Sequence, residues 1–338
     1  DVDTGDSQPT LIYVITALPA EGTVTNNNDG TYSFAPGSAF QDLALGETRS
    51  VSFTYTATDM HGVTTPNATI TVTVTGVNDA PVAMDMNITA IEDGPAVLFP
   101  FNADDIDSDD HPGTLDYTIV TTPSEGSVAE NGNGTFTFNP GTMFQDLAAG
   151  ETRDVTFTYT ATDQHLAVSH TGTVTVTVTC VNDKPVAQTV TGVNAVEDGP
   201  AVMGSFDADD VDSDNTPANL SYVITRQPTE GSAANNLNGT FSFNPGSGFQ
   251  NLAVGENRTV SFDYRATDRH GAASNTAMVL VDVTGVNDAP TASNISFSIS
   301  EDGPPVTRAF NGNDIDSDHS PSTLTYTFTN PAQGTVTN

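Results

Sequence analysis

The sequence predicts an all-β protein made of immunoglobulin-like β-sandwich domains that follow one another in a tandem linear array. Three observations support this fold class: short strands of alternating polarity, turn signals between the strands, and a repeat about as long as one small domain. The 338 residues suffice for two or three domains of about 100–200 residues, or for a tandem array.

The strands are predicted from their period of two. Residues 69–75 alternate between Thr and Ile or Val, and residues 51–57 alternate in the same way. Patterns rich in β-branched and aromatic residues are typical of half-buried antiparallel strands. Asn28-Asp29-Gly30 predicts a hairpin turn, because glycine adopts positive φ without strain. Residues 40–45 could form only a short turn under the core, and about seven such strands per repeat indicate a sandwich.

The repeat is clearest in a Val-Asn-Asp motif at residues 77–79, 181–183 and 286–288. Glu-Asp-Gly-Pro, Asp-x-Asp and Phe-Gln motifs recur at the same spacing of about 104 residues, which fits complete domains and is too long for a solenoid unit. We interpret the sequence as a segment of a longer array, in which the first repeat lacks its opening strand and the last is partial. The predicted repeats are 1–79, 80–183, 184–288 and 289–338.

The charge of the chain excludes several classes of partner. Acidic residues number 43 against 8 basic ones, which gives a net charge of −35. Nucleic-acid binding needs clustered Lys and Arg, and an anionic membrane surface would repel this chain. No apolar run approaches about 18 residues, so we expect no membrane insertion. Cys180 is the single cysteine, which excludes a disulfide framework and predicts a buried thiol acting as a small hydrophobe.

Several of the repeated motifs resemble those of a known bacterial family. Residues 46–49, 53–59 and 72–81, which end in Gly-Val-Asn-Asp-Ala-Pro, are similar to the VCBS repeat. That module is cadherin-like and forms the stalks of large secreted RTX-type adhesins. The resemblance covers essentially the whole chain. It implies an extracellular location on the bacterial cell surface, binding of Ca²⁺, and a role in cell adhesion or biofilm formation.

The resemblance also implies a set of calcium ligands at each junction between repeats, because calcium takes about six to eight oxygen ligands. For the first junction these are Glu47, Asn78, Asp79, Asp105, Asp107 and Asp163. For the second they are Glu92, Glu151, Asn182, Asp183, Asp210, Asp212 and Asp268. For the third they are Glu197, Glu256, Asn287, Asp288, Asp314 and Asp316. The linkers are shorter than those of animal cadherins, so we expect roughly one to three ions per junction.

Ordinary turn chemistry is the competing explanation for these acidic residues, since Asp and Asn bond to their own backbone in loops. The Asp-x-Asp motif nevertheless recurs at one phase in four copies, the earliest being Asp1-Val2-Asp3. This regularity favours calcium. The following acids extend the motif and are open candidates: Asp109, Asp214 and Asp318. An EF-hand does not fit, because the glycine, the later glutamate and the flanking helices are lacking.

No catalytic set stands out, so we expect no enzyme. No Ser/His/Asp arrangement recurs, and His61, His165 and His270 are interpreted as turn residues after a strand-end Asp. The sequence therefore predicts a calcium-stiffened spacer of a surface adhesin whose partners are the neighbouring repeats. One alternative is a self-associating subunit of an extracellular fibre or sheath, with like chains as partners. A polysaccharide-binding repeat is less favoured, because such sites usually present exposed aromatics and Trp is absent.

Overall fold

The computed structural model describes residues 10–337, which contain β-strands, the short 3₁₀ turn η2 (Gly37–Phe40) and no α-helix. This confirms the predicted all-β class. Contacts divide the chain into two units, which are described separately below. Unit 1 comprises residues 1–144 and 151–180, and unit 2 comprises residues 145–150 and 181–338.

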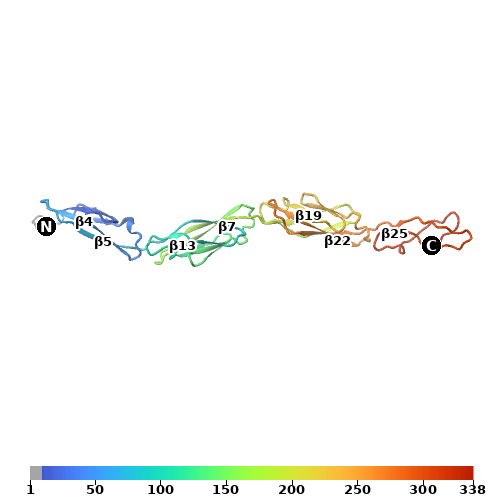
Figure 1. Ribbon diagram of the computed structural model, residues 1–338, viewed down its shortest axis with the longest axis horizontal. Helices are drawn as coiled ribbons and strands as arrows, with labels where there is room; N and C mark the ends of the chain where they lie inside the picture. Colours follow the sequence, from blue (N-terminus) through green and yellow to red (C-terminus); the bar gives the residue numbers. More distant parts are fainter. Residues whose placement is uncertain (1–9, 338) are drawn as a thin grey trace. The chain divides into compact units, whose positions relative to one another are not determined.

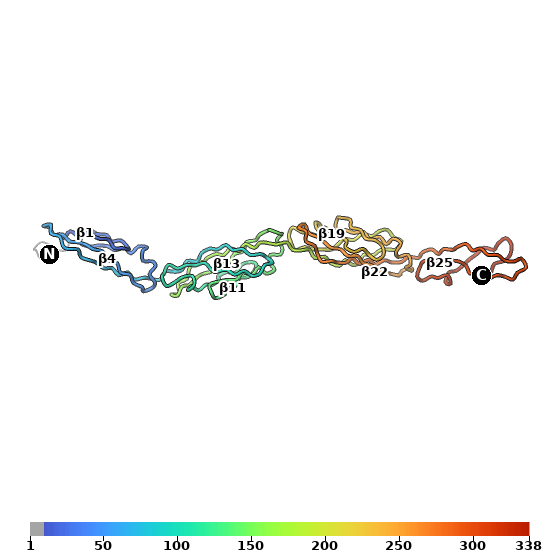
Figure 2. The backbone as a smooth tube through the Cα atoms, viewed as in Figure 1, coloured from blue at the N-terminus to red at the C-terminus, as the bar shows by residue number. Residues whose placement is uncertain are grey.

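The first repeat of unit 1 has a three-stranded sheet and a hairpin (Figures 1 and 2). The sheet has the order β1-β4-β5 and the hairpin is β2-β3. Their bounds are β1 (Ile12–Ala17), β2 (Thr23–Asn26), β3 (Tyr32–Ala35), β4 (Thr48–Thr58) and β5 (Ala68–Thr75). The strands predicted at 51–57 and 69–75 are therefore confirmed as parts of β4 and β5. The predicted hairpin is also confirmed, with Gly30 at φ 85° and Asn28 at φ 62°.

The second repeat of unit 1 is a two-sheet sandwich. One sheet has the order β10-β13-β14-β7 and the other β11-β12-β8, while β6 and β9 form a separate pair. All pairs are antiparallel except β14 with β7. The bounds are β6 (Val82–Ala83), β7 (Met86–Ile91), β8 (Val97–Pro100), β9 (Ala103–Asp104), β10 (Asp116–Thr121), β11 (Ser127–Glu130), β12 (Thr135–Asn139), β13 (Thr152–Thr162) and β14 (Gly172–Thr179).

Unit 2 repeats this architecture. Its sheets have the orders β16-β23-β22-β19 and β17-β21-β20, with the small pairs β15-β18 and β24-β25. The bounds are β15 (Val186–Ala187), β16 (Val190–Val196), β17 (Val202–Ser205), β18 (Ala208–Asp209), β19 (Ser221–Arg226), β20 (Ser232–Asn235), β21 (Thr240–Asn244), β22 (Asn257–Thr267), β23 (Ala277–Thr284), β24 (Thr291–Ala292) and β25 (Gly312–Asn313). The sequence repeat therefore corresponds to a repeat of structure.

The core of each sandwich follows from the alternation of its strands. In β14 the valines are fully buried while the threonines between them lie on the other, half-buried face. Phe136 of one sheet packs edge-on against Phe157 of the other, with ring centroids 5.1 Å apart. The buried Tyr159 hydroxyl donates to the carbonyl of Met84 at 2.7 Å. This bond satisfies a polar group in the core and ties β13 to the segment that follows β6.

Candidate metal centres

Each candidate site is assembled from three segments that strand pairing brings together. In unit 1 these are the linker after β5, the Asp-x-Asp loop after β9, and Asp163, which directly follows β13. Val82 of β6 pairs with Asp104 of β9, and Ala83 pairs with Ala103. This two-residue pairing fixes the linker beside the loop that carries the aspartates.

Hydrogen bonds join five of the predicted ligands of the first junction. The Asn78 amide donates to Asp163 Oδ2 at 2.8 Å, and the Asp79 backbone N–H donates to Asp107 Oδ2 at 2.9 Å. The Asp107 backbone N–H in turn donates to Asp105 Oδ1 at 2.9 Å. The structure therefore brings together residues that lie up to 85 positions apart.

These bonds leave one buried oxygen atom without a hydrogen bond on each of several side chains. Asp107 is only 2% exposed, yet its Oδ1 accepts no hydrogen bond, and neither do Asp105 Oδ2 and Asn78 Oδ1. A buried carboxylate oxygen without a partner is costly unless a cation or a donor satisfies it. The free atoms are all carboxylate or amide oxygens, the donors that hard divalent cations prefer. The cluster thus fits a Ca²⁺ ion.

Several negative charges lie close together in this cluster, and burial and these charges together raise the pKa values of two of its aspartates. Burial raises the pKa of Asp107, and the charges of Asp105, Asp79 and Asp109 raise it further, against the backbone hydrogen bond from Asp79. Burial likewise raises the pKa of Asp105, with contributions from Asp110 and Asp163. Opposite charge close to these groups would favour their ionised form.

Unit 2 contains the same arrangement around its first linker. The Asn182 amide donates to Asp268 Oδ2 at 2.8 Å, and the backbone N–H of Asp183 donates to Asp212 Oδ2 at 3.1 Å. Burial, followed by the charges of Asp210 and Asp183, raises the pKa of Asp212 to about 6. In contrast, the pKa of Asp268 is lowered: burial acts to raise it, but hydrogen bonds from Asn182 and three backbone amides outweigh that effect.

A third cluster follows β23, where β24 and β25 pair as β6 and β9 do. The backbone N–H of Asp288 donates to Asp316 Oδ2, and that of Asp316 donates to Asp314 Oδ1, both at 3.1 Å. Glu197 lies at this same end, since its Oε1 accepts the Val286 backbone N–H at 2.7 Å. Asn287 is exposed, unlike its half-buried counterparts Asn78 and Asn182, and its amide donates to the carbonyl of Asp288 as theirs do to the next residue.

The glutamates that precede the long strands flank the linkers. The backbone carbonyls of Glu47, Glu151 and Glu256 accept the N–H groups of Gly76, Cys180 and Gly285 at 2.8–2.9 Å. The side chain of Glu47 accepts the hydroxyl of Ser108 at 2.8 Å, and Glu256 accepts that of Ser317 at 2.7 Å. Ser108 also donates its backbone N–H to the carbonyl of Asp42 at 3.0 Å. The serine after each Asp-x-Asp motif, which the sequence analysis missed, therefore binds the preceding repeat.

Glu92 and Glu151 belong to unit 1, whereas the other five residues predicted for the second junction belong to unit 2. Glu92 is 1% exposed and accepts the thiol of Cys180 at 2.8 Å. Cys180 is buried, which confirms that prediction, and its thiol also donates to the Glu92 carboxylate, a contact that the sequence did not indicate. Gly76, at the equivalent position, has no such room: a Cβ there would lie 2.3 Å from the carbonyl of Leu43.

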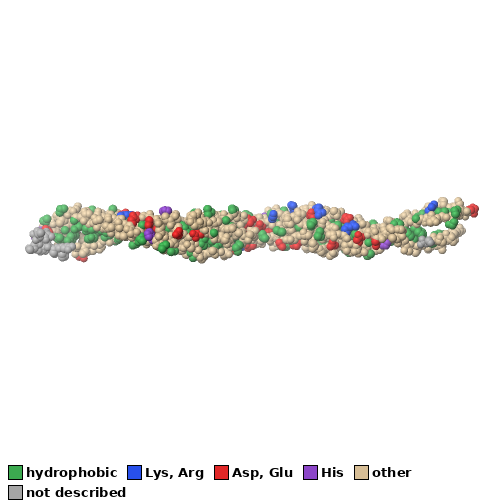
Figure 3. All heavy atoms as spheres, turned by 90° about the horizontal axis from the view of Figure 1, so that it is seen from below, with side chains coloured by type: hydrophobic (Ala, Val, Ile, Leu, Met, Phe, Trp, Pro, Cys, Tyr) green, Lys and Arg blue, Asp and Glu red, His purple; other side chains and the backbone are tan. Residues whose placement is uncertain are grey.

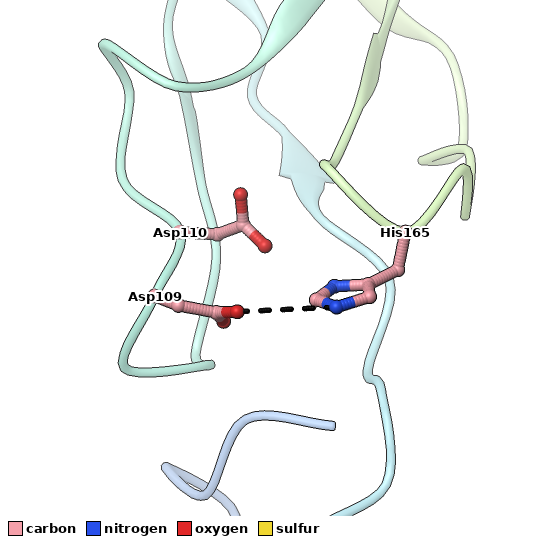
Figure 4. Close-up of side chains that lie close together, drawn as sticks. All are labelled: Asp109, Asp110 and His165. Atoms are coloured by element: carbon pink, nitrogen blue, oxygen red, sulfur yellow. Dashed lines mark ion pairs between the residues drawn. The ribbon is translucent and has the colours of Figure 1, made fainter. Parts of the chain in front are cut away.

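Two adjacent aspartates that follow the Asp-x-Asp motif, Asp109 and Asp110, differ in their exposure to solvent. Asp109 is exposed, and its Oδ2 lies 4.0 Å from Nε2 of His165 (Figure 4). Asp110 is buried, and a carboxylate oxygen of Asp110 lies within 4.8 Å of Asp105 and Asp163 oxygens. The extended sequence motif indicates Asp109 as a candidate, whereas nothing in the motif indicates Asp110. Asp1-Val2-Asp3 lies outside the described residues.

Basic side chains contribute little to the surface that Figure 3 draws, in agreement with the small number of Lys and Arg residues. In the described part of unit 1, Arg49 pairs with Asp42 at 2.7 Å and Arg153 pairs with Glu125 at 3.1 Å. The acids in these two ion pairs, Asp42 and Glu125, lie outside the first cluster.

Comparison with protein families settles the class of module. Residues 1–76, 78–180 and 182–285 each match the model of the bacterial cadherin-like domain. The chain belongs to the bacterial cadherin-like domain family. No curated protein sequence is significantly similar to it. Between residues 10 and 337 there is no helix of the length and apolar character that a membrane span requires.

Solved cadherin structures resemble this bacterial cadherin-like chain in fold. The extracellular domain of protocadherin gammaB4 has a TM-score of 0.51 and 15% identity, and the match covers 92% of this chain. This chain spans 51% of that protocadherin. Domains EC3-6 of protocadherin gammaB7, in a cis-dimer structure, have a TM-score of 0.49 and 17% identity, covering 92% of this chain and 78% of that one. For Drosophila N-cadherin EC1-4 the TM-score is 0.35 and the identity 16%, with coverages of 92% and 77%.

Proposed function

We propose that these bacterial cadherin-like repeats are calcium-stiffened spacers of a large secreted surface adhesin of the RTX type. In this role they serve cell adhesion or biofilm formation and carry out no catalysis. The observation that carries the proposal is the set of buried carboxylates that retain unbonded oxygens beside each linker. The same geometry in three clusters supports one repeated function.

The proposed mechanism follows from the position of the clusters. Asn78 and Asp79 lie in the linker, while Asp105, Asp107 and Asp163 belong to the repeat that follows it. A bound Ca²⁺ would attract all of these oxygens and so tie the linker to the domain. Without it, the charges repel one another and the linker is free to bend. The described hydrogen bonds from Ser108 provide a weaker attachment that needs no ion.

Small-angle X-ray scattering of the 338-residue chain, with calcium and with a chelator, tests this proposal. We expect the maximum dimension and the radius of gyration to change on chelation and to be restored by added calcium. The triple variant Asp107→Asn, Asp212→Asn and Asp316→Asn should no longer respond to calcium. A scattering profile unaffected by chelation of the wild-type chain would contradict the proposal.

A matched control separates ligation from loss of charge. Asp116, Glu130 and Asp302 are exposed acids outside the three clusters. The variant Asp116→Asn, Glu130→Gln and Asp302→Asn removes the same three negative charges and should respond to calcium as the wild type does. Filaments that form only with calcium, seen by electron microscopy, would instead favour a self-associating fibre.

A further inference from the structure

The position three residues after the Asp-x-Asp motif holds a different potential ligand in each of the three clusters. It is Asp110 in the first cluster, Asn215 in the second and His319 in the third. A turn brings it back toward the motif in all three, because its backbone N–H donates to the carbonyl of the second aspartate. These bonds are Asp110 to Asp107 at 3.2 Å, Asn215 to Asp212 at 3.0 Å and His319 to Asp316 at 3.2 Å.

The Asp110 carboxylate is held with one oxygen free. Its Oδ1 accepts the hydroxyl of Thr114 at 3.1 Å and the amide of Gln164 at 3.2 Å. Its Oδ2 accepts nothing, although the side chain is only 6% exposed. Asp110, Asp105 and Asp163 each place an oxygen within 4.8 Å of the others. Figure 4 shows Asp110 reaching from its loop toward the loop of His165, which follows Asp163. No described group donates a hydrogen bond to the remaining oxygen, Asp110 Oδ2.

The second cluster offers an uncharged group in the same place. Asn215 is 5% exposed; its Oδ1 accepts the Arg269 backbone N–H at 3.5 Å, and its amide nitrogen has no hydrogen-bond partner among the described residues. An amide can contribute one neutral oxygen where a carboxylate contributes charge. The neighbouring loop differs too: Arg269 occupies the position of Gln164 and pairs with Asp214 at 3.5 Å. The second cluster therefore has less negative charge around the cation position than the first.

The third cluster offers nitrogen at this position. Asp314, Asp316 and His319 place ligand atoms within 4.8 Å of one another. Calcium prefers oxygen donors, whereas imidazole nitrogen suits softer divalent metals. A histidine therefore replaces an oxygen ligand with one that calcium binds less well.

We propose that this third position supplies an additional calcium ligand and that its identity grades the affinity of the sites along the chain. Asp110 makes the first site the tightest, Asn215 gives an intermediate site, and His319 gives the weakest. This inference rests on the proposed calcium function. It adds a ligand that the Asp-x-Asp motif and the linker do not contain.

Calcium titration by isothermal calorimetry on the full chain tests the grading, with two of the three sites disabled in turn. Asp212→Asn with Asp316→Asn leaves the first site, and Asp107→Asn with Asp316→Asn leaves the second. The first site should bind more tightly. Adding Asp110→Asn should weaken it about tenfold, and adding Asn215→Asp should strengthen the second about tenfold, because affinity follows the charge of the ligands.

Asp116→Asn is the matched control, since it removes the same charge from an exposed side chain of the same repeat that lies outside the cluster. It should change the affinity of the first site by less than about threefold. The gain from Asn215→Asp cannot come from misfolding, which keeps the test decisive if Asp110→Asn folds poorly. Unchanged affinities in both Asp110→Asn and Asn215→Asp, or an equal loss in Asp116→Asn, would overturn this proposal while leaving calcium binding intact. No calcium uptake by the wild type would overturn the proposed function and this inference with it.

Discussion

The centre and the end of the second repeat are both buried, but they differ in how their atoms are satisfied. In the centre, Phe136 and Phe157 are in contact and the hydroxyl of Tyr159 has hydrogen-bond partners. At the end, Asp107 and Asp110 are almost as deeply buried and each has an oxygen without a partner. We therefore expect the core to stabilise the fold with and without a cation, whereas the end should gain stability when a cation or protons neutralise its carboxylates.

The largest effect that distinguishes the two regions comes from the core. Phe157→Ala should destabilise the second repeat by about 3–5 kcal/mol, because a fully buried aromatic side chain leaves a cavity. The loss should be equal with calcium and with chelator, as measured by urea unfolding of the full chain. Phe262→Ala, at the equivalent position in the third repeat, should behave in the same way. A loss of stability that appears only with calcium would contradict this distinction between the core and the end of the repeat.

The next largest effect is that of Asp107→Asn on stability, which should differ in direction with calcium and with chelator. Asp107→Asn keeps the shape of the side chain but removes its charge. With calcium at about a hundred times the dissociation constant, it should cost about 3 kcal/mol, the binding free energy that the ion adds to folding. With chelator, it should be neutral or stabilising, because a buried like charge is gone. Thermal unfolding in both conditions checks this, and destabilisation of equal size in both would contradict it.

Acid should stabilise the calcium-free ends. Because the pKa of Asp212 in the folded chain is about 6, above its ordinary 3.8, the folded state holds this proton more tightly than the unfolded state does. The resulting stability is fully present below about pH 4 and is lost as the pH rises through 6. With chelator, lowering the pH from 7 to 5 should raise the stability of the third repeat by about 1–2 kcal/mol.

Asp212→Asn is the control for this pH dependence, since the amide does not titrate. The increase in stability between pH 7 and 5 should shrink by the contribution of Asp212. With calcium present, the trend should weaken or reverse, because protons then compete with the ion for the same oxygens. An Asp212→Asn chain with the full wild-type pH dependence would assign the effect to other groups.

The smallest expected effect concerns the contact that needs no ion. Ser108→Ala removes the hydroxyl that donates to Glu47 and leaves the backbone bond to Asp42 in place. The loss of one exposed hydrogen bond should cost about 0.5–1 kcal/mol. Ser317→Ala, whose hydroxyl donates to Glu256, should give a similar value. Urea unfolding with chelator measures both losses, and a cost above that of Asp107→Asn with calcium would make the serine contact the main attachment.

Local patterns predicted the strands and the hairpin well, because each depends on neighbours in sequence. The alternation of residues 69–75 and the glycine at position 30 suffice for β5 and for the turn between β2 and β3. The repeat period and the family resemblance also placed Asn78 and Asp163 in one predicted ligand set. In the structure the Asn78 amide nitrogen lies 2.8 Å from Asp163 Oδ2.

Contacts that depend on a tight turn or on a substitution in one repeat could not be predicted in this way. The turn from Asp107 to Asp110 buries the second of two adjacent aspartates and exposes the first, and composition does not distinguish them. Because the residue at this position differs between the three clusters, comparison of the repeats gives no motif that would have indicated it. The bond from Cys180 to Glu92 has no counterpart at Gly76, which has no side chain to donate.

The central claim is that calcium completes the buried ends of the repeats. It is tested most directly by the change in unfolding temperature that calcium causes in the full chain, compared with the triple variant Asp107→Asn, Asp212→Asn and Asp316→Asn. We predict a large increase for the wild type and little or none for the variant. The same increase in both chains, or none in the wild type, would contradict the claim.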